Sequence, residues 1–448
     1  MEHIDTLLHA RWIIPVRPAN AALAHHTLAV HRGRIVACLP TAAARDRFTA
    51  NHDLTLRQHA LIPGLVNAHT HAAMTLFRGL ADDKALMDWL QNHMWPAEQT
   101  HVNHAFVRDG ARLAIAEMLL GGTTTFNDMY FFPDAVAQVA RDIGMRAAVG
   151  LIMVDFPSAW AQTPEDYLRL GLELHDQIRD EPLISAAFAP HAPYTVSDEP
   201  LQRIRTLADE LQLPIHMHVH ETAHEVRAAV ADHGERPLDR LHRLGLLSPS
   251  LLAVHMTQLT PADIDLTANT GAHVIHCPES NLKLASGQCP IHTLRQAGIN
   301  VALGTDGAAS NNDLDMLSET RSAALLAKAA AADPTALPAA AALEMATLGG
   351  ARALGLDDAI GSLEIGKAAD IAAVDLAAPA TTPVYDPIAQ IVYAAGRDQI
   401  SHVWVAGVRQ VDQGQLTRIN LPDALAAANA WAERIRPEQH RHNPDLSA

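Results

Sequence analysis

The sequence predicts an α/β protein: a parallel (β/α)8 TIM barrel with a small β-sandwich domain formed from both ends of the chain. Two observations predict this fold. Between residues 60 and 365, short apolar runs alternate with longer amphipathic stretches, which is typical of a barrel with parallel strands. At both ends of the chain, short strands and turns prevail instead. The strands expected in the middle region are 61–68, 123–127, 146–151, 183–189, 214–220, 251–255, 273–276 and 300–304.

The two ends of the chain supply the predicted β-sandwich. Residues 27–37 hold two apolar runs separated by Arg32-Gly33-Arg34, a pattern typical of a hairpin. Residues 369–375 and 402–411 also have the pattern of strands, and the latter turns at Ala406-Gly407. We therefore expect two domains. A discontinuous β-domain, helical at its C-terminal end, is built from residues 1–60 plus 366–448. A catalytic barrel domain is built from residues 61–365.

Composition excludes several classes of function. The 448 residues carry 33 basic and 50 acidic side chains, a formal net charge of −17 at pH 7. Nucleic-acid binding needs clustered Lys and Arg to neutralise phosphates, so this balance argues against it. The three scattered cysteines offer no disulfide framework. Because the sequence shows neither a secretion signal nor an apolar run of about 18 residues, we expect a cytoplasmic protein with no membrane partner.

Two of the expected strands end in closely spaced histidines. His69 and His71 lie two positions apart at the end of the first strand, so their side chains point to one face and can share a metal ion. The fifth strand, 214–220, carries three histidines at the same spacing and is followed by Glu221. These three span too much of the strand to bind one ion together. Taken alone, either group is equally consistent with core or exposed histidines.

Polar residues also end the sixth and eighth strands, at His255 and Asp306. In a (β/α)8 barrel, the carboxyl ends of the strands build the active site. Buried polar side chains are costly unless they are paired or bind a metal. Several of them at one end of the barrel therefore predict a metal centre, and Glu221 beside it is suited to transferring protons.

The motifs that carry these residues resemble those of the amidohydrolase superfamily. The resemblance covers essentially the whole chain, and the motifs follow the order that the family has. They are Pro63-Gly-Leu-Val-Asn-Ala-His-Thr-His71, Met217-His-Val-His-Glu221, Val254-His255, His276-Cys-Pro-Glu-Ser-Asn-Leu-Lys-Leu-Ala-Ser-Gly287, Gly304-Thr-Asp306-Gly307 and Gly361-Ser-Leu-Glu-Ile-Gly-Lys-Ala-Ala-Asp370. The last of these is similar to the segment with which the chain re-enters the β-domain in that family.

The resemblance implies a metal ion bound by His69, His71, His218 and Asp306. Zn²⁺ is the expected ion, and Fe²⁺ occurs in relatives. Superfamily members with two metals bridge them with a carboxylated Lys or a Glu that ends the fourth strand. Here that strand ends Phe188-Ala-Pro-His191, which offers neither. We therefore expect one metal ion per subunit.

The resemblance also implies a mechanism, hydrolytic deamination. A divalent cation lowers the pKa of water toward about 7, so hydroxide is available at neutral pH. His255 and Asp306 are expected to orient that water and accept its proton. Glu221 is expected to protonate the ring nitrogen beside the attacked carbon and later to help ammonia leave.

Within the superfamily, the sequence is most similar to the deaminases of 5′-methylthioadenosine and S-adenosylhomocysteine. The stretches that carry this resemblance are Thr75-Leu-Phe-Arg-Gly-Leu-Ala-Asp-Asp83, Trp89-Leu90 and Trp95-Pro-Ala-Glu98. It implies that Glu98 binds the ribose hydroxyls, which suits a carboxylate acceptor. Trp89 is expected to line the pocket and His191 to contact the purine, together with Glu221. From the sequence alone, Trp89 could equally pack in the core.

The chain departs from that family in one respect. Relatives that bind S-adenosylhomocysteine supply arginines from the loop before the fourth strand. Residues 154–163 contain none and offer Phe156 and Trp160 instead. Arg169 and Arg179 lie further along and do not align clearly. We therefore rank methylthioadenosine first as the substrate, with S-adenosylhomocysteine and adenosine second.

Other functions remain as alternatives. Guanine, pterin and triazine hydrolases of the same superfamily differ in the region of Trp89 and Glu98. Ring opening like that of dihydroorotase is disfavoured by the missing Lys, and a non-enzymatic scaffold by the presence of all four expected ligands. Zinc-dependent cytidine deaminases carry P-C-x-x-C, which is absent. The sequence leaves open whether the protein forms a homo-oligomer, as relatives often do, and what Asn281, Lys283 and Ser286 contribute.

Overall fold

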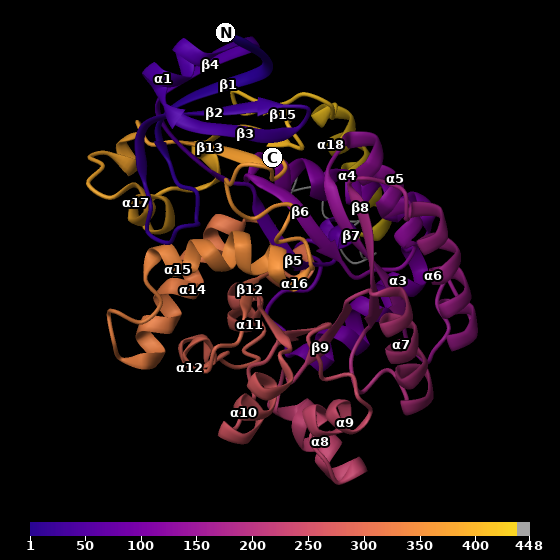
Figure 1. The fold of residues 1–448 in the computed structure, drawn as a ribbon. Coiled ribbons are helices and arrows are strands. Elements are labelled where there is room, and N and C mark those ends of the chain that lie inside the picture. The colour runs from indigo at the N-terminus through magenta and orange to yellow at the C-terminus, as the bar shows by residue number, and fades with distance from the viewer. Residues whose placement is uncertain (437–448) are drawn as a thin grey trace, which may run out of the picture.

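The computed structural model describes residues 1–436, which form two eight-stranded sheets (Figure 1). One sheet is a near-closed parallel barrel surrounded by helices, which confirms the predicted architecture. Its strands neighbour one another in chain order, from β5 to β12. They are β5 Leu65–Thr70, β6 Thr123–Asp128, β7 Arg146–Met153, β8 Ile184–Pro190, β9 Ile215–Val219, β10 Leu251–His255, β11 His273–His276 and β12 Val301–Leu303.

The first predicted strand, 61–68, is wrong as a single element. Residues 61–63 form the end of strand β4, which belongs to the other sheet, and β5 begins only at Leu65. Gly64 separates the two strands, and a Cβ at this position would lie 2.1 Å from the hydroxyl oxygen of Thr124. The chain therefore needs glycine where it crosses from one sheet into the wall of the barrel. The other seven predicted strands overlap the observed ones.

Helices cover the outer face of the barrel, and short ones shape the loops at the strand ends. Two helices expected from the pattern of the sequence, 199–211 and 313–332, correspond to α7 and α14. The helices between β5 and β9 are η1 Ala72–Phe77, α2 Leu86–Trp89, η2 Leu90–Met94, α3 Trp95–His101, α4 His104–Leu120, α5 Pro133–Ile143, α6 Pro164–Ile178 and α7 Asp198–Leu211. Those after β9 are α8 Ala223–His233, α9 Pro237–Arg243, α10 Pro261–Thr270, α11 Pro278–Lys283, α12 Ile291–Gln296, α13 Ala308–Asn311, α14 Met316–Ala331, α15 Ala339–Glu344, η3 Met345–Gly349 and α16 Gly350–Ala353.

Both ends of the chain build the second sheet, in the order β16-β15-β14-β13-β4-β1-β2-β3. The two predicted hairpins are confirmed, because β2 pairs antiparallel with β3 and β14 with β15. The elements are β1 Glu2–Ile13, β2 Leu23–His31, β3 Arg34–Pro40, α1 Thr41–Arg47, β4 Phe48–Pro63, β13 Ile371–Asp375, η4 Pro379–Thr381, α17 Pro387–Tyr393, η5 Arg397–Gln399, β14 Ile400–Val405, β15 Val408–Asp412, β16 Gln415–Leu416 and α18 Leu421–Ile435. The expected β-domain extends to residue 448, and its residues 437–448 lie outside the described part.

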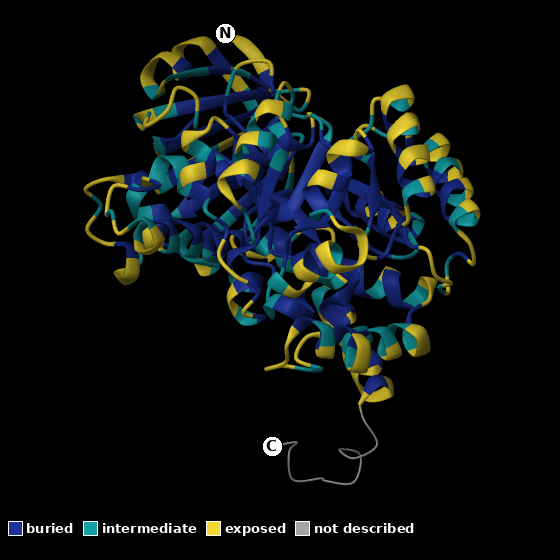
Figure 2. Ribbon diagram, turned by 90° about the horizontal axis from the view of Figure 1, so that it is seen from below, coloured by how far each residue is buried: buried dark blue, intermediate teal, exposed yellow. Residues whose placement is uncertain are grey.

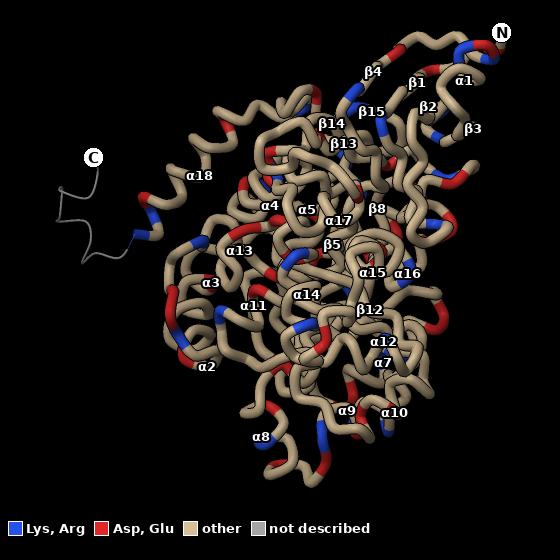
Figure 3. The backbone as a smooth tube through the Cα atoms, turned by 90° about the vertical axis from the view of Figure 1, so that its left-hand side faces the viewer, with Lys and Arg blue, Asp and Glu red and all other residues tan. Residues whose placement is uncertain are grey.

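Burial follows this layered arrangement. Buried residues fill the barrel and its contact with the surrounding helices, whose outer faces are exposed (Figure 2). Charged residues of both signs are interspersed over the outer elements seen in Figure 3. Within residues 1–436, none of the helices combines the length and the apolar character that crossing a bilayer requires.

Polar contacts close the barrel between its first and last strands. The side-chain amide of Asn67 donates to the hydroxyl of Thr305 at 2.7 Å, and its oxygen accepts from the Thr305 backbone N–H at 3.0 Å. The backbone N–H of Asp306 donates to the His69 carbonyl at 3.0 Å. A Cβ on Gly304 would lie 2.8 Å from the His69 backbone nitrogen, so glycine permits this close approach. The carboxyl ends of β5 and β12 are thereby held side by side.

A buried ion pair joins the barrel to the second sheet. Nε of Arg146, at the start of β7, lies 3.0 Å from Oδ2 of Asp370, just before β13. The other oxygen of Asp370 accepts from the Ala406 backbone N–H at 2.6 Å. Arg146 and Asp370 are 8% and 3% exposed, so neither charge has water as an alternative partner.

We expect Asp370→Ala to destabilise the protein by about 3–5 kcal/mol, because the Arg146 guanidinium stays buried without a countercharge. The thermal and urea midpoints measure this loss. Arg169→Ala is the matched control, since it removes an arginine from surface ion pairs within α6, which should cost less than about 1 kcal/mol. Equal losses of stability in both variants would contradict the role given to the buried Arg146–Asp370 pair. Replacing Arg146 and Asp370 together by Leu should recover much of the stability.

Candidate active site

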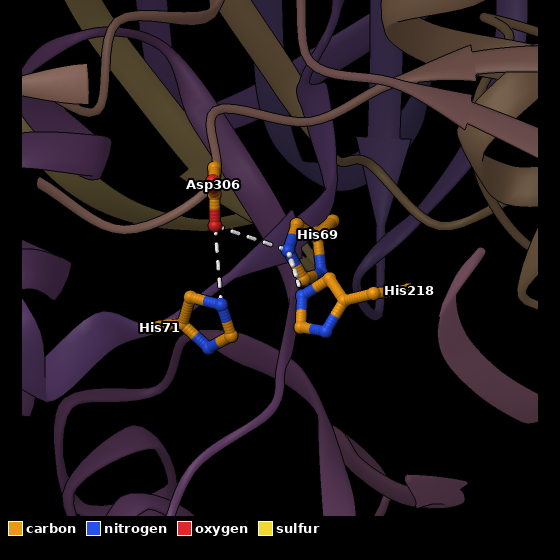
Figure 4. A group of neighbouring side chains, drawn as sticks. All are labelled: His69, His71, His218 and Asp306. Carbon is orange, nitrogen blue, oxygen red and sulfur yellow. Dashed lines mark hydrogen bonds and ion pairs between the residues drawn. The ribbon is translucent and has the colours of Figure 1, made fainter. Parts of the chain in front are cut away.

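Four side chains meet at the carboxyl end of the barrel (Figure 4). His69 lies on β5 and His71 directly after it, His218 lies on β9, and Asp306 follows β12. One nitrogen or oxygen atom of each lies within 4.8 Å of the corresponding atoms of the others. The fold therefore brings together all four residues that the sequence indicated as metal ligands.

Hydrogen bonds fix which ring nitrogen each histidine presents to the centre. Nδ1 of His71 and Nδ1 of His218 donate to backbone carbonyls, at 2.5 and 2.8 Å. Nδ1 of His69 lies 2.7 Å from Nε2 of His216, a hydrogen-bond distance. With Nδ1 protonated in all three rings, the three Nε2 atoms have free lone pairs that point to the centre, the form in which histidines bind a metal ion.

The distances between these atoms fit a single metal ion. Nε2 of His69 lies 3.2 Å from Oδ1 of Asp306 and 3.2 Å from Nε2 of His218. Nε2 of His71 lies 3.1 Å from the same oxygen. Ligands that bind zinc at about 2.0–2.1 Å are separated from one another by roughly 3 Å. Two unprotonated ring nitrogens at such a distance repel unless a cation lies between them, so the donor set suits a divalent ion.

Asp306 is ionised although it is buried. Its Oδ2 accepts hydrogen bonds from the hydroxyls of Ser280, at 2.7 Å, and Ser310, at 2.8 Å. Burial by itself would raise the pKa of Asp306, but the His69 and His71 rings next to its Oδ1 bring that pKa well below its ordinary value. Neither serine was predicted from the sequence. Ser310 lies one helical turn after Asp306, and that spacing was the only local signal for it.

His255 and Glu221 face the same centre. His255 is the last residue of β10, and its Nε2 lies 3.9 Å from Oε2 of Glu221, two residues after β9. Burial raises the pKa of Glu221, so this carboxyl keeps a proton to a higher pH than an ordinary Glu. His220, His255 and Asp306 have left-handed backbone, with φ of 53°, 75° and 63°. Such costly conformations cluster at functional sites.

A cavity opens at this end of the barrel, and it gathers the remaining residues that the sequence indicated. The site residues in its lining are His71, Trp89, Glu98, His191, His218, Glu221, His255 and Asp306. His69 is fully buried behind them. Of the four residues expected to bind the substrate, Glu221 lies beside the metal centre, and Trp89, Glu98 and His191 share the same cavity with it.

Each of these three side chains has a distinct electrostatic setting. Trp89 lies at the end of α2, and its indole N–H is buried without a hydrogen-bond partner in residues 1–436. Burial raises the pKa of Glu98 to about 7, against the opposing effect of a 2.8 Å hydrogen bond from the Tyr130 hydroxyl. Burial lowers the pKa of His191 to about 3, so its ring is neutral. Tyr130 was not predicted from the sequence as a site residue, although this tyrosine lies two residues after barrel strand β6.

Aromatic side chains surround Glu98. Trp95, Phe131 and Phe156 line both the cavity and a hollow that adjoins it. Of the two aromatic residues expected to replace the family's arginines, Phe156 lines the cavity. Trp160 does not line it, and packs instead against Tyr167 with ring centroids 5.6 Å apart.

Lys and Arg are absent from the cavity wall, as far as residues 1–436 show. Arg169 pairs with two carboxylates of its own helix, and Arg179 lies beside Asp180 with 65% of its side chain exposed. Neither arginine lines the cavity.

Known proteins resemble this chain along nearly its whole length. A model of the amidohydrolase family matches residues 60–409. The chain is 49% identical to the 5-methylthioadenosine/S-adenosylhomocysteine deaminase of Saccharophagus degradans, over 97% of this chain and 98% of that protein. It is also 49% identical to the protein of the same name from Teredinibacter turnerae, over 96% and 98%.

Solved structures share both the fold and much of the sequence. The crystal structure of an adenosine deaminase from Xanthomonas campestris with bound zinc has a TM-score of 0.96 and 55% identity, and covers 97% of this chain and 99% of that one. Atrazine chlorohydrolase from Arthrobacter aurescens TC1, complexed with zinc, has a TM-score of 0.87 and 25% identity, with coverage of 95% and 99%. With the family model spanning the barrel and relatives matching almost end to end, this chain belongs to the amidohydrolase family.

Proposed function

We propose that this protein is a metal-dependent deaminase of adenine nucleosides, with 5′-methylthioadenosine as its first substrate and S-adenosylhomocysteine or adenosine second. One observation carries the proposal: the cavity that holds the metal centre also holds Glu98, a buried carboxylate suited to two ribose hydroxyls. The names of the relatives, and the zinc bound in the Xanthomonas structure, support it. Water and the nucleoside give the inosine analogue and ammonia.

We infer that His69, His71, His218 and Asp306 hold one Zn²⁺ per chain, with Fe²⁺ as the alternative. A divalent cation supplies Lewis-acid chemistry there, since it makes water acidic enough to attack the ring at neutral pH. The end of β8 supports a single ion, because the chain there reads Ala189-Pro190-His191 and offers no bridging carboxylate or lysine.

His255, Asp306 and Glu221 divide the proton transfers. Asp306 orients the attacking water, and His255 takes up its proton at Nε2, the nitrogen that faces Glu221. Glu221 delivers a proton from Oε2 to the ring nitrogen beside the attacked carbon, and then assists the departure of ammonia. The pKa values support this assignment, because burial raises the pKa of Glu221, whereas the neighbouring His69 and His71 rings outweigh burial and lower the pKa of Asp306.

The cavity wall supports a nucleoside with a neutral 5′ group. Ionised Glu98 accepts from the ribose hydroxyls, neutral His191 contacts the purine, and the unpartnered indole N–H of Trp89 is available to an acceptor of the substrate. Next to Glu98 lie Trp95 and Phe156, which suit a methylthio group. An amino-acid tail would bring a carboxylate to a wall that has no Lys or Arg among the described residues, which is unfavourable.

Turnover is the first test of the proposal. Zinc-loaded protein should deaminate methylthioadenosine faster than S-adenosylhomocysteine or adenosine, and a chelator should abolish the reaction. Loss of adenine absorbance measures the rate, with guanine and a chlorotriazine as parallel substrates. Faster turnover of S-adenosylhomocysteine would overturn the preference for a neutral 5′ group. Turnover of guanine or the triazine alone would replace the nucleoside assignment by the other activities of the family.

We expect KM for methylthioadenosine to rise as the pH falls below about 7. The pKa of Glu98 is raised to about 7, so its carboxylate is ionised above that pH and protonated below it, where it accepts ribose hydroxyls less well. Glu98→Gln should lower kcat/KM by roughly 10–100-fold, as expected for a hydrogen bond to a charged group, and should remove this pH dependence of KM. A KM that rises equally in both proteins would show that another group titrates.

His216→Leu should weaken zinc binding by about 10–100-fold, because His69 loses the acceptor that fixes its ring. Competition with a chromophoric chelator measures the dissociation constant. His220→Leu is the matched control directly after the same strand, since His220 accepts from the Leu238 backbone N–H. Equal weakening in the two variants would indicate general loosening of β9 and contradict the role given to His216.

A further inference from the structure

The segment of residues 277–287, which contains α11, contacts the proposed proton-transfer groups from outside the cavity. Ser280 donates to Asp306, and the hydroxyl of Ser286 lies 3.4 Å from Oε1 of Glu221. Asn281 reaches His255, with Oδ1 of the amide 2.9 Å from Nδ1 of the ring. None of these three residues lines the cavity, so each acts only through its neighbour.

Asn281 is held rigidly in this position. Its backbone N–H donates to the Cys277 carbonyl at 3.0 Å, and its carbonyl accepts from the Ser286 N–H at 3.0 Å. Its side chain is buried, with 2% of the residue exposed, as is His255 with 1%. The amide therefore has a fixed position from which to orient the ring.

The contact determines which nitrogen of His255 carries the proton. A neutral imidazole has one N–H, and an amide oxygen can only accept a hydrogen bond. Nδ1 of His255 therefore bears the hydrogen, and Nε2 keeps its lone pair on the side of Glu221, 3.9 Å away. The opposite tautomer would leave Nδ1 and the amide oxygen as two acceptors facing each other, which is unfavourable.

The other end of the amide argues against a packing role. Nδ2 of Asn281 is buried and finds no hydrogen-bond partner within residues 1–436. A buried polar atom without a partner is costly, so a position that served packing alone would favour an apolar side chain of similar size.

We propose that Asn281 is a positioning residue for His255: its amide oxygen fixes the tautomer and the ring orientation that leave Nε2 free to take up a proton. The inference rests on the proposed deaminase function. An amide, unlike a carboxylate, fixes the tautomer without adding a further negative charge to a site that already contains the carboxylate of Asp306.

The test compares Asn281→Leu, which removes the acceptor at similar size, with Asn281→Asp, which keeps an acceptor oxygen. Leu282→Ala is the control, because Leu282 lies on the same helix with 55% of its surface exposed. Kinetics on methylthioadenosine, zinc content and thermal midpoint are measured for each zinc-loaded protein. Asn281→Leu should lower kcat by about 100-fold, within the range of acid–base catalysis, and change KM by less than about threefold. Asn281→Asp should stay within about tenfold of the unmodified kcat, and all proteins should hold equal zinc.

Several outcomes would overturn the inference. One is an unchanged kcat in Asn281→Leu, and another is an equal loss of kcat in both Asn281 variants. A loss of zinc that parallels the loss of kcat would assign the effect to the metal centre. If Asn281→Leu does not fold, Asn281→Asp decides alone, since a 100-fold fall in its kcat contradicts the role. Absence of turnover in the unmodified protein would overturn the proposed function and this inference with it. If the unmodified protein turns over methylthioadenosine normally, a contrary result with the variants overturns only the role given to Asn281.

Discussion

The site depends first on the closure of the barrel between β5 and β12. Asn67 binds Thr305 through both ends of its amide, and the Asp306 N–H donates to the His69 carbonyl. These contacts join residues more than two hundred positions apart in the sequence. Without them, the histidines at the end of β5 and the carboxylate that follows β12 would not converge, and the donor set would be incomplete. The contacts that close the barrel therefore also bring the proposed metal ligands together.

The environment of each carboxyl group gives the two acids of the site different properties. Asp306 and Glu221 are both buried, yet the His69 and His71 rings hold the pKa of Asp306 down, while burial raises that of Glu221. The difference lies in their partners. Asp306 contacts two imidazole rings and accepts two short hydroxyl bonds, whereas Glu221 has one distant hydroxyl. A single segment after β11 supplies a hydroxyl to each of these carboxyl groups.

Local patterns in the sequence predicted the barrel, its strand ends and the residues that gather there. They did so because a period of two places His69 and His71 on one face, and because polar residues at strand ends share one side of a barrel. They failed where the structure depends on contacts between segments that lie far apart in the sequence. The run 61–68 is apolar apart from Asn67, and only the approach of Thr124 shows that Gly64 divides it. Tyr130, Ser280 and Asn281 act through contacts with residues far along the chain, which periodicity cannot reveal.

The lack of Lys and Arg in the described wall of the cavity bears on the cellular pool of adenine compounds. Most soluble adenine in a cell carries phosphate at the 5′ position. A phosphate there would meet aromatic rings and the carboxylate of Glu98, with no Lys or Arg in the described lining to balance it. A deaminase built in this way can work in the presence of abundant nucleotides without consuming them. Discrimination against these 5′-phosphorylated compounds then needs no separate structural element, because it follows from the absence of Lys and Arg from the described cavity wall.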